Sequence, residues 1–308
     1  MNKVGFIGVG IMGKSMVRNL MKAGFELHIY ARTKSKVEDV ISEGAQFHES
    51  IKDCVQDCDA VITIVGFPQD VEEVYFDQGN ILDSAKKGAY LIDMTTTSPQ
   101  IAEKIYEEGT KRGFHVMDAP VTGGDTGAKA GTLSILVGGE KEDYKACMPL
   151  FEAMGTNINY QGKAGCGQHC KLANQIMIAG TLSGVCEALT YAKEQGLDPE
   201  VFMKSVATGA AGSKQLDTFG PKILKDDYAP GFFMKHFIKD MKLALIEANR
   251  KGLSLDVLSM VLANYEELEQ EGYGDLGTQA LMKFYDEEHR NTDCLLYTSP
   301  SPRDGLLS

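Results

Sequence analysis

Two hydrophobic patterns alternate along the first half of the chain. Short runs rich in aliphatic and β-branched residues, such as KVGFIGV, ELHIYA and AVITIV, alternate with amphipathic stretches whose apolar positions repeat at helical spacing. AYLIDM, FHVMDAP and TLSILVGG continue the alternation to about residue 162. Strands separated by helices of this kind are typical of βαβ units on a parallel sheet. We therefore expect residues 1–163 to form a doubly wound α/β domain.

The second half of the chain shows helical periodicity interrupted by glycine and proline. Residues 168–195 contain no proline and keep apolar residues at helical spacing, which predicts one long helix that ends before Gly196. Asp198 and Pro199 then predict an N-cap and first turn. Further helices are expected over residues 235–251, 256–271 and 276–288. We expect an all-helical domain for substrate binding and oligomerisation over residues 164–290, joined to the first domain by the long helix.

Residues 291–308, NTDCLLYTSPSPRDGLLS, do not fit this scheme. They contain two Ser-Pro pairs and show no periodicity, which favours a disordered segment. The segment also looks like vector read-through, so we expect a non-native tail.

Composition and charge exclude several classes of partner. The chain has 308 residues and a formal net charge of −12, which disfavours nucleic acid and anionic membranes. No run approaches the ~18 uninterrupted apolar residues of a membrane span, and no signal-peptide pattern is visible. We expect a cytoplasmic protein. Cys166 and Cys170 could share a helix face, but no second pair with zinc-ligand spacing completes a site, so no metal is expected.

The first predicted strand leads into a glycine-rich turn. Gly8, Gly10 and Gly13 form a GxGxxG pattern between VGFIG and a helix that begins near Ile11 and Met12. In the Rossmann dinucleotide-binding fold, the first glycine allows the tight turn, the second lets pyrophosphate approach the backbone, and the third lets helix and strand pack closely. The helix N-terminus then offers free amides to the pyrophosphate.

The residues after the second predicted strand bear on the choice of cofactor. NAD-binding proteins usually place a carboxylate there for the ribose 2′-hydroxyl, whereas this chain has Arg32, Thr33 and Lys34. A guanidinium, a hydroxyl and an ammonium suit a 2′-phosphate. We therefore expect NADP, with NAD as the alternative; a solvated basic loop is the other interpretation of these residues.

Four further segments carry a family resemblance. DMTTTSP at 93–99, DAPVTGG at 118–124, GCGQHCKLANQ at 165–175 and FIKDMKLAL at 237–245 resemble the motif set of the β-hydroxyacid dehydrogenases. This family includes 3-hydroxyisobutyrate dehydrogenase, 2-hydroxy-3-oxopropionate (tartronate semialdehyde) reductase and the glyoxylate/succinic semialdehyde reductases. The resemblance spans about residues 3–289, with the motifs in the family's order.

The resemblance implies roles for individual residues. Lys171 matches the catalytic lysine, and Asn174 matches an asparagine that contacts substrate. Thr122 replaces the serine that binds the substrate carboxylate, and Gly123 and Gly124 follow it. The residues implied to contact or border the cofactor are Val65, Gly66, Phe67, Pro68, Thr96 and Lys239. Where the family often has a second asparagine after Asn174, this chain has a glutamine, which bears on substrate fit.

The chemistry of these side chains agrees with the implied roles. Reduction of an aldehyde needs a hydride from the cofactor, a proton at the carbonyl oxygen and a group that orients the substrate. Lys171 as an ammonium can supply the proton, and its neutral form can act as the base in oxidation. Lys171 and Asn174 are three residues apart on the long helix and so share a face. The glycine amides after Thr122 can bind a carboxylate.

These observations predict an NADP-dependent reductase that converts a small carboxylate-bearing semialdehyde to a β-hydroxyacid. NAD-dependent 3-hydroxyisobutyrate dehydrogenase is the alternative within the family. An imine reductase shares the architecture but lacks the lysine at this position. A non-catalytic NADP-binding sensor is the alternative from another class, and loss of Lys171 or of the glycine turn would be its expected mark. The small residues of the long helix favour close packing, and we expect a homodimer or homotetramer.

Overall fold

The computed structural model describes residues 1–285, so the predicted tail at 291–308 and the end of the last predicted helix lie outside the described residues. The described chain forms two compact units. One contains Met1–Met177 and His236–Leu255, and the other contains Ile178–Lys235 and the described residues from Asp256 onward. The units therefore do not follow chain order, and the boundary expected between residues 163 and 164 stays a prediction.

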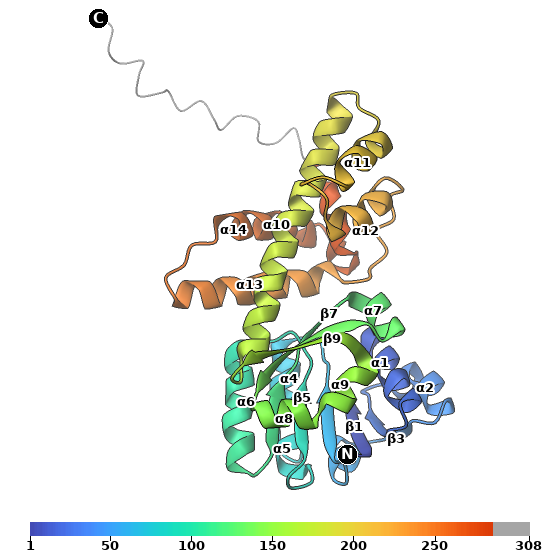
Figure 1. The fold of residues 1–308 in the computed structure, drawn as a ribbon, viewed down its shortest axis with the longest axis vertical. Helices are drawn as coiled ribbons and strands as arrows, with labels where there is room; N and C mark the ends of the chain where they lie inside the picture. Colours follow the sequence, from blue (N-terminus) through green and yellow to red (C-terminus); the bar gives the residue numbers. More distant parts are fainter. Residues whose placement is uncertain (286–308) are drawn as a thin grey trace, which may run out of the picture. The chain divides into compact units, whose positions relative to one another are not determined.

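The first unit is built on one mixed, mostly parallel sheet (Figure 1). Its strand order is β3-β2-β1-β4-β5-β6-β8-β7, with β9 paired to β8. The strands are β1 (Lys3–Ile7), β2 (Glu26–Tyr30), β3 (Gln46–His48), β4 (Ala60–Thr63), β5 (Tyr90–Asp93), β6 (His115–Asp118), β7 (Val121–Thr122), β8 (Leu133–Gly139) and β9 (Gly155–Gly162). The order 3-2-1-4-5-6 confirms the doubly wound Rossmann arrangement.

One edge of the sheet departs from the expected parallel pattern. β8 runs antiparallel to β6 and β7 and parallel to β9. The helix before β8, α7 (Gly124–Ala130), has only 7 residues and spans ~10 Å, so it is too short to return the chain along the sheet for a parallel crossover. The sequence pattern gives strand positions but not this change of direction.

Helices cover both faces of the parallel part of the sheet. Ile62 and Ile92 contribute to one buried apolar cluster, and their neighbours Val61 and Leu91 contribute to the other. This alternation explains why the strands read as nearly continuous apolar runs. The helices before residue 165 are α1 (Ile11–Lys22), α2 (Glu38–Ser42), α3 (Ile51–Val55), α4 (Pro68–Phe76), α5 (Ile81–Ser84), α6 (Pro99–Lys111), α7, α8 (Lys141–Ala146) and α9 (Met148–Met154), with the 3-10 turn η1 (Lys34–Lys36).

The rest of the described chain is helical, and the predicted long helix is confirmed. The helices are α10 (Cys166–Glu194), α11 (Pro199–Ala207), α12 (Lys214–Ile223), α13 (Met234–Arg250) and α14 (Asp256–Gln270), followed by the 3-10 segments η2 (Tyr273–Asp275) and η3 (Thr278–Tyr285). In residues 1–285, only α10 has the length and hydropathy of a membrane span. Core helices of soluble proteins pass the same test, and 44% of its apolar window is buried.

Two details of the helical half differ from the sequence prediction. The sequence pattern did not predict α12, whose N-cap is Ser213. The α-helix expected over residues 276–288 is wrong for the part that is described, where 3-10 turns occur instead. Gly272 has a φ of 94°, and Met234 N donates to Leu276 O. The turn at Gly272 and the tertiary hydrogen bond at Leu276 therefore prevent a continuous helix from forming over this segment.

Candidate functional site

The glycine turn after β1 shows which glycines the fold itself requires. Gly8 has a φ of 97°, and a Cβ added there would lie 2.1 Å from Ile64 O. A Cβ at Gly13 would lie 2.2 Å from Gly8 O. Both positions therefore exclude a side chain because of neighbouring backbone.

Gly10 has no such internal reason to be glycine. It is the N-cap of α1 with φ −88°, and a Cβ added there would meet nothing within 4 Å. The space beside Gly10 opens at the N-terminus of α1, where the amides of Ile11, Met12 and Gly13 belong to the first turn and favour an anion. This cradle, which a Cβ would fill, fits the pyrophosphate of a dinucleotide.

The carboxyl ends of four parallel strands are aligned beside this turn. Ile7 pairs with Thr63, Thr63 with Asp93, and Asp93 with Asp118. The loops that follow these residues therefore leave the sheet at the same edge. β1 and β4 are neighbours at the point where the strand order reverses, which is where doubly wound folds bind their ligands.

Asp93 holds two of these loops together. Its buried Oδ1 accepts hydrogen bonds from Thr63 Oγ1 at 2.8 Å and from Thr95 N at 3.1 Å. Thr95 Oγ1 in turn accepts from Val65 N at 3.0 Å. Burial raises the pKa of Asp93 to about 6. The predicted loop residues Val65 and Thr96 thus belong to segments that the strand ends position directly.

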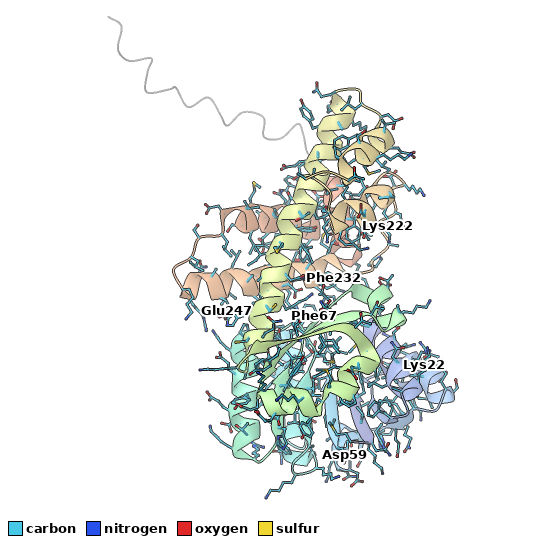
Figure 2. The ribbon with its side chains drawn as sticks, viewed as in Figure 1. Lys22, Asp59, Phe67, Lys222, Phe232 and Glu247 are labelled. Carbon is cyan, nitrogen blue, oxygen red and sulfur yellow. The ribbon has the colours of Figure 1, made fainter. Side chains whose placement is uncertain are left out.

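The remaining predicted residues of the loop after β4 lead into α4. Gly66 precedes Phe67, the N-cap, and Pro68 is the first helical residue. Phe67, labelled in Figure 2, lies beside His236 of α13, with 4.9 Å between the ring centroids. Phe67 N donates to Asp70 Oδ2 at 3.0 Å. Asp70 also pairs with Arg32.

The basic segment after β2 is placed at the end of its strand, as predicted. Thr33 is the N-cap of η1, and Lys34 is the first residue of that turn. Lys34 Nζ lies 3.6 Å from Glu49 Oε1, and Arg32 pairs with carboxylates of α4. The sequence predicted the cations but gave no indication of these acidic partners.

The start of α10 is fixed to the same edge of the sheet. Asp118 accepts from Gly165 N and Gln168 N, each at 2.8 Å. Gln168 is fully buried; its Oε1 accepts from Thr97 N at 3.0 Å, and its Nε2 donates to Thr95 O at 2.7 Å. Asp118 therefore orients the beginning of α10.

Lys171 lies one turn beyond Gln168 and is buried, with a relative exposure of 7%. A chain of polar contacts runs close to it. Asn174 Nδ2 donates to Gln175 Oε1 at 2.8 Å, and Gln175 Nε2 donates to Asp240 Oδ2 at 2.6 Å. Asp240 Oδ1 lies 3.0 Å from Lys239 Nζ, which also donates to the backbone oxygen of Thr96. The predicted residues Asn174, Lys239 and Thr96 thus belong to one network.

Burial dominates the electrostatics of Lys171. It lowers the pKa of the amine to about 8; Asp240 opposes this shift, and Lys239 adds to it. An amine with a pKa near neutrality can both give and accept a proton at physiological pH. Such perturbed groups gather at functional sites.

The predicted carboxylate-binding turn links β7 to α7, with Gly123 as the N-cap of α7 and Gly124 as its first residue. Gly123 and Gly124 have φ values of 129° and 64°, a conformation that favours glycine at both positions. Thr122 ends β7. Within residues 1–285, the contacts that join Asn174 through Gln175 and Asp240 to Lys239 do not include this turn.

Sequence reasoning did not assign Gln168, Asp240 or Asp70 to the site. Gln168 and Asp240 stand inside the quoted segments GCGQHCKLANQ and FIKDMKLAL, but their burial becomes visible only in the fold. In the described part of the chain, no group of three or more His, Cys, Asp or Glu side chains is placed to hold a metal ion.

Comparisons with known proteins match both halves of the described chain. The protein-family model described as the NAD binding domain of 6-phosphogluconate dehydrogenase matches residues 3–162. The model described as NAD-binding of NADP-dependent 3-hydroxyisobutyrate dehydrogenase matches residues 165–285. Together the two family models cover the glycine turn, the loops at the strand ends, Lys171 and the polar network close to it.

Individual relatives match over most of their length. YkwC of Bacillus subtilis, described as an oxidoreductase, is 49% identical over 92% of this chain and 98% of its own. The 2-hydroxy-3-oxopropionate reductase of Escherichia coli is 37% identical over 82% and 86%, respectively. A structure of Mycobacterium tuberculosis 3-hydroxyisobutyrate dehydrogenase with L-serine superposes with a TM-score of 0.84 at 26% identity and covers 92% of this chain and 98% of that one.

The two family models and the relatives that match over most of their length lead to one assignment: this chain belongs to the β-hydroxyacid dehydrogenase family of NAD(P)-dependent oxidoreductases.

Proposed function

We propose that this enzyme is an NADP-preferring reductase that converts a small semialdehyde to a β-hydroxyacid. The substrate class is that of 2-hydroxy-3-oxopropionate, or of succinic semialdehyde and glyoxylate. The observation that carries the proposal is the buried amine of Lys171, whose pKa is lowered to about 8 by burial and is influenced by the charges of Asp240 and Lys239.

Lys171, Asn174, Gln175 and Asp240 each have a role in this proposal. When bound, the reduced nicotinamide supplies the hydride for the aldehyde carbon. Lys171 donates the proton to the aldehyde oxygen, and its ammonium stabilises the negative charge that develops there. Asp240 raises the pKa of the amine, Gln175 donates a hydrogen bond to Asp240, and Asn174 offers an amide to the substrate.

The substrate carboxylate is assigned to the turn at Thr122, Gly123 and Gly124. Both glycines adopt positive φ, and the absence of side chains leaves their backbone N–H groups accessible to a small anion. Thr122 adds a hydroxyl donor. The dinucleotide is assigned to the cradle of Gly8, Gly10 and Gly13, with Arg32, Thr33 and Lys34 at the ribose.

A second candidate function is oxidation of 3-hydroxyisobutyrate with NAD. The ion pairs that Arg32 and Lys34 make with carboxylates favour it, because paired cations attract a 2′-phosphate less strongly than free ones. Rates with both cofactors against semialdehydes and 3-hydroxyisobutyrate distinguish the two candidates.

The variant Lys171→Ala tests the proposed mechanism. We expect turnover of the semialdehydes to fall by at least ~10²-fold, the usual contribution of a positioned general acid, while binding of NADPH stays nearly normal. Lys163→Ala is the matched control, since Lys163 is exposed and precedes the same helix. Steady-state rates and NADPH titration provide both measurements. Unchanged turnover in Lys171→Ala would remove this amine from the mechanism.

A further inference from the structure

Arg32 is held by two carboxylates from another element. Its Nη2 donates to Asp70 Oδ1 and lies 3.6 Å from Glu73 Oε2. Asp70 and Glu73 are three residues apart on α4 and therefore project from the same side of that helix. One guanidinium thus faces two carboxylates, so the local charge at the end of β2 is not the positive charge that the sequence predicts.

Asp70 is the fixed member of this group. Its second oxygen, Oδ2, accepts from Phe67 N at 3.0 Å and so closes the first turn of α4. The side chain of Asp70 is 20% exposed, compared with 63% for Arg32. A ligand at the end of β2 can therefore displace the guanidinium more easily than the carboxylate.

The position of this carboxylate matters because β2 lacks its own. Rossmann domains that bind NAD use an acidic side chain at the end of the second strand to accept a hydrogen bond from the ribose 2′-hydroxyl. Here β2 is followed by Arg32, and α4 brings the acidic group to the guanidinium. A 2′-phosphate at this place gains attraction from Arg32 but is repelled by Asp70 and Glu73. A 2′-hydroxyl has no charge to be repelled and can donate to a carboxylate.

We propose that Asp70, assisted by Glu73, is a cofactor-selectivity residue that supplies from α4 the carboxylate missing at β2 and limits the preference for NADPH over NADH. The inference rests on the proposed binding of the ribose beside Arg32. It assigns to this enzyme the use of both cofactors, with selectivity set by the balance between one guanidinium and two carboxylates.

The test measures equilibrium binding of NADPH and of NADH to the full chain without substrate. The chain has no tryptophan, so the emission of the reduced nicotinamide reports binding without overlap from indole. In Asp70→Asn, the amide oxygen can still accept from Phe67 N while the charge is removed. We expect this variant to bind NADPH about two- to fivefold more tightly, a change typical of one partly exposed ion pair, and to bind NADH equally or less tightly.

Two further variants separate the charge from the helix cap and from general effects. Glu73→Gln removes the second carboxylate without touching the cap, and we expect a smaller shift in the same direction. Glu72→Gln is the matched control: it makes the same charge change on the same helix, but Glu72 pairs with Lys104 at 3.0 Å. It should leave the ratio of the two dissociation constants unchanged.

The variant Arg32→Gln distinguishes failure of this inference from failure of the proposed function. We expect it to weaken NADPH binding and to abolish the effect of Asp70→Asn in the double variant. If Arg32→Gln leaves NADPH binding unchanged, the assignment of Arg32 to the 2′-phosphate and the inference both fail. If Arg32→Gln weakens NADPH but Asp70→Asn weakens it too, or changes both cofactors by the same factor, only the selectivity role of Asp70 is overturned.

Discussion

Lys171 shows how burial can make a common surface residue chemically useful. An exposed lysine has a pKa of ~10.4 and is almost wholly protonated at neutral pH. Burial lowers this pKa to about 8, and the carboxylate of Asp240 keeps it from falling further. The site therefore holds an amine that changes its charge within the range in which cells work.

The pH dependence of the reaction should follow this amine. Reduction requires the ammonium form, so we expect kcat/KM for the semialdehyde to be high below pH 8 and to decline above it; in oxidation the rate should rise through the same pH. Asp240 raises the pKa of Lys171, so Asp240→Asn should move the midpoint to lower pH. Glu72→Gln should not move it. A midpoint that moves upward in Asp240→Asn would contradict the assigned interaction.

The sequence predicted the polar residues of the site better than their partners. Lys171, Asn174, Thr96 and Lys239 were identified from motifs. The structure joins Asn174, Thr96 and Lys239 in one network, and the charges of Asp240 and Lys239 in that network act on the pKa of Lys171. The pairing of Arg32 with Asp70 was not predictable, because it joins residues 38 positions apart whose separation depends on how α4 packs. The roles of the site residues stay predictions until variants are measured.

The elements of the site depend on the junction between α10 and the sheet. The side chain of Gln168 forms hydrogen bonds with the backbone of Thr95 and Thr97, on either side of Thr96. Asp118 accepts hydrogen bonds from two backbone N–H groups at the start of α10. These contacts fix the helix that carries Lys171 to the loop that carries Thr96. The junction therefore couples the stability of α10 to the geometry of the site.

Replacement of Gln168 by leucine should affect both stability and cofactor binding. The change leaves Thr97 N and Thr95 O buried without their partner, and we expect the free energy of unfolding to fall by about 1–3 kcal/mol and the KM for NADPH to rise. Urea denaturation and steady-state kinetics measure the two effects. His169→Leu, at an exposed neighbouring position, is the control. A Gln168 variant as stable as this control would show that the two hydrogen bonds contribute nothing to the free energy of unfolding.

Helices with strong local signals were predicted to within about two residues at their described ends, as for α10, α13 and α14. The failures were α12, the 3-10 turns η2 and η3, and the antiparallel direction of β8. Periodicity and capping are local properties of the sequence, and they are enough to predict helices such as α10, α13 and α14. Strand direction and turns held by tertiary hydrogen bonds depend on distant residues, which a local pattern does not record.

Several large apolar side chains of the described chain are exposed to solvent. Val257 and Met260 on α14 are 59% and 51% exposed, and their spacing places them on one face of that helix. Tyr191 and Val201 are also exposed in the same compact unit. Contiguous exposed apolar surface favours association. The homodimer or homotetramer expected from the sequence stays a prediction, and the face of α14 with Val257 and Met260 is where we test it.

Charged substitutions on α14 should dissociate such an oligomer without unfolding the chain. We expect the unmodified protein to elute as a dimer or larger at micromolar concentration, and the double variant Val257→Asp and Met260→Asp to shift toward the monomer mass. Ser259→Asp adds a charge to a different side of α14 and should not shift it. Size-exclusion chromatography with light scattering provides the masses. A monomer mass for the unmodified protein would end the oligomer hypothesis.

The discontinuity of the first compact unit has a consequence for biosynthesis. Lys239 and Asp240 lie in its second segment, which follows the whole of Ile178–Lys235 in the chain. A ribosome adds roughly 5–20 residues per second, so the nascent chain carries Lys171 for several seconds before its acidic neighbour exists. During that interval neither Lys171 nor Gln175 has the carboxylate of Asp240 that acts on it in the folded chain. The reactive centre therefore matures late in translation, after the glycine turn and the sheet have already been made.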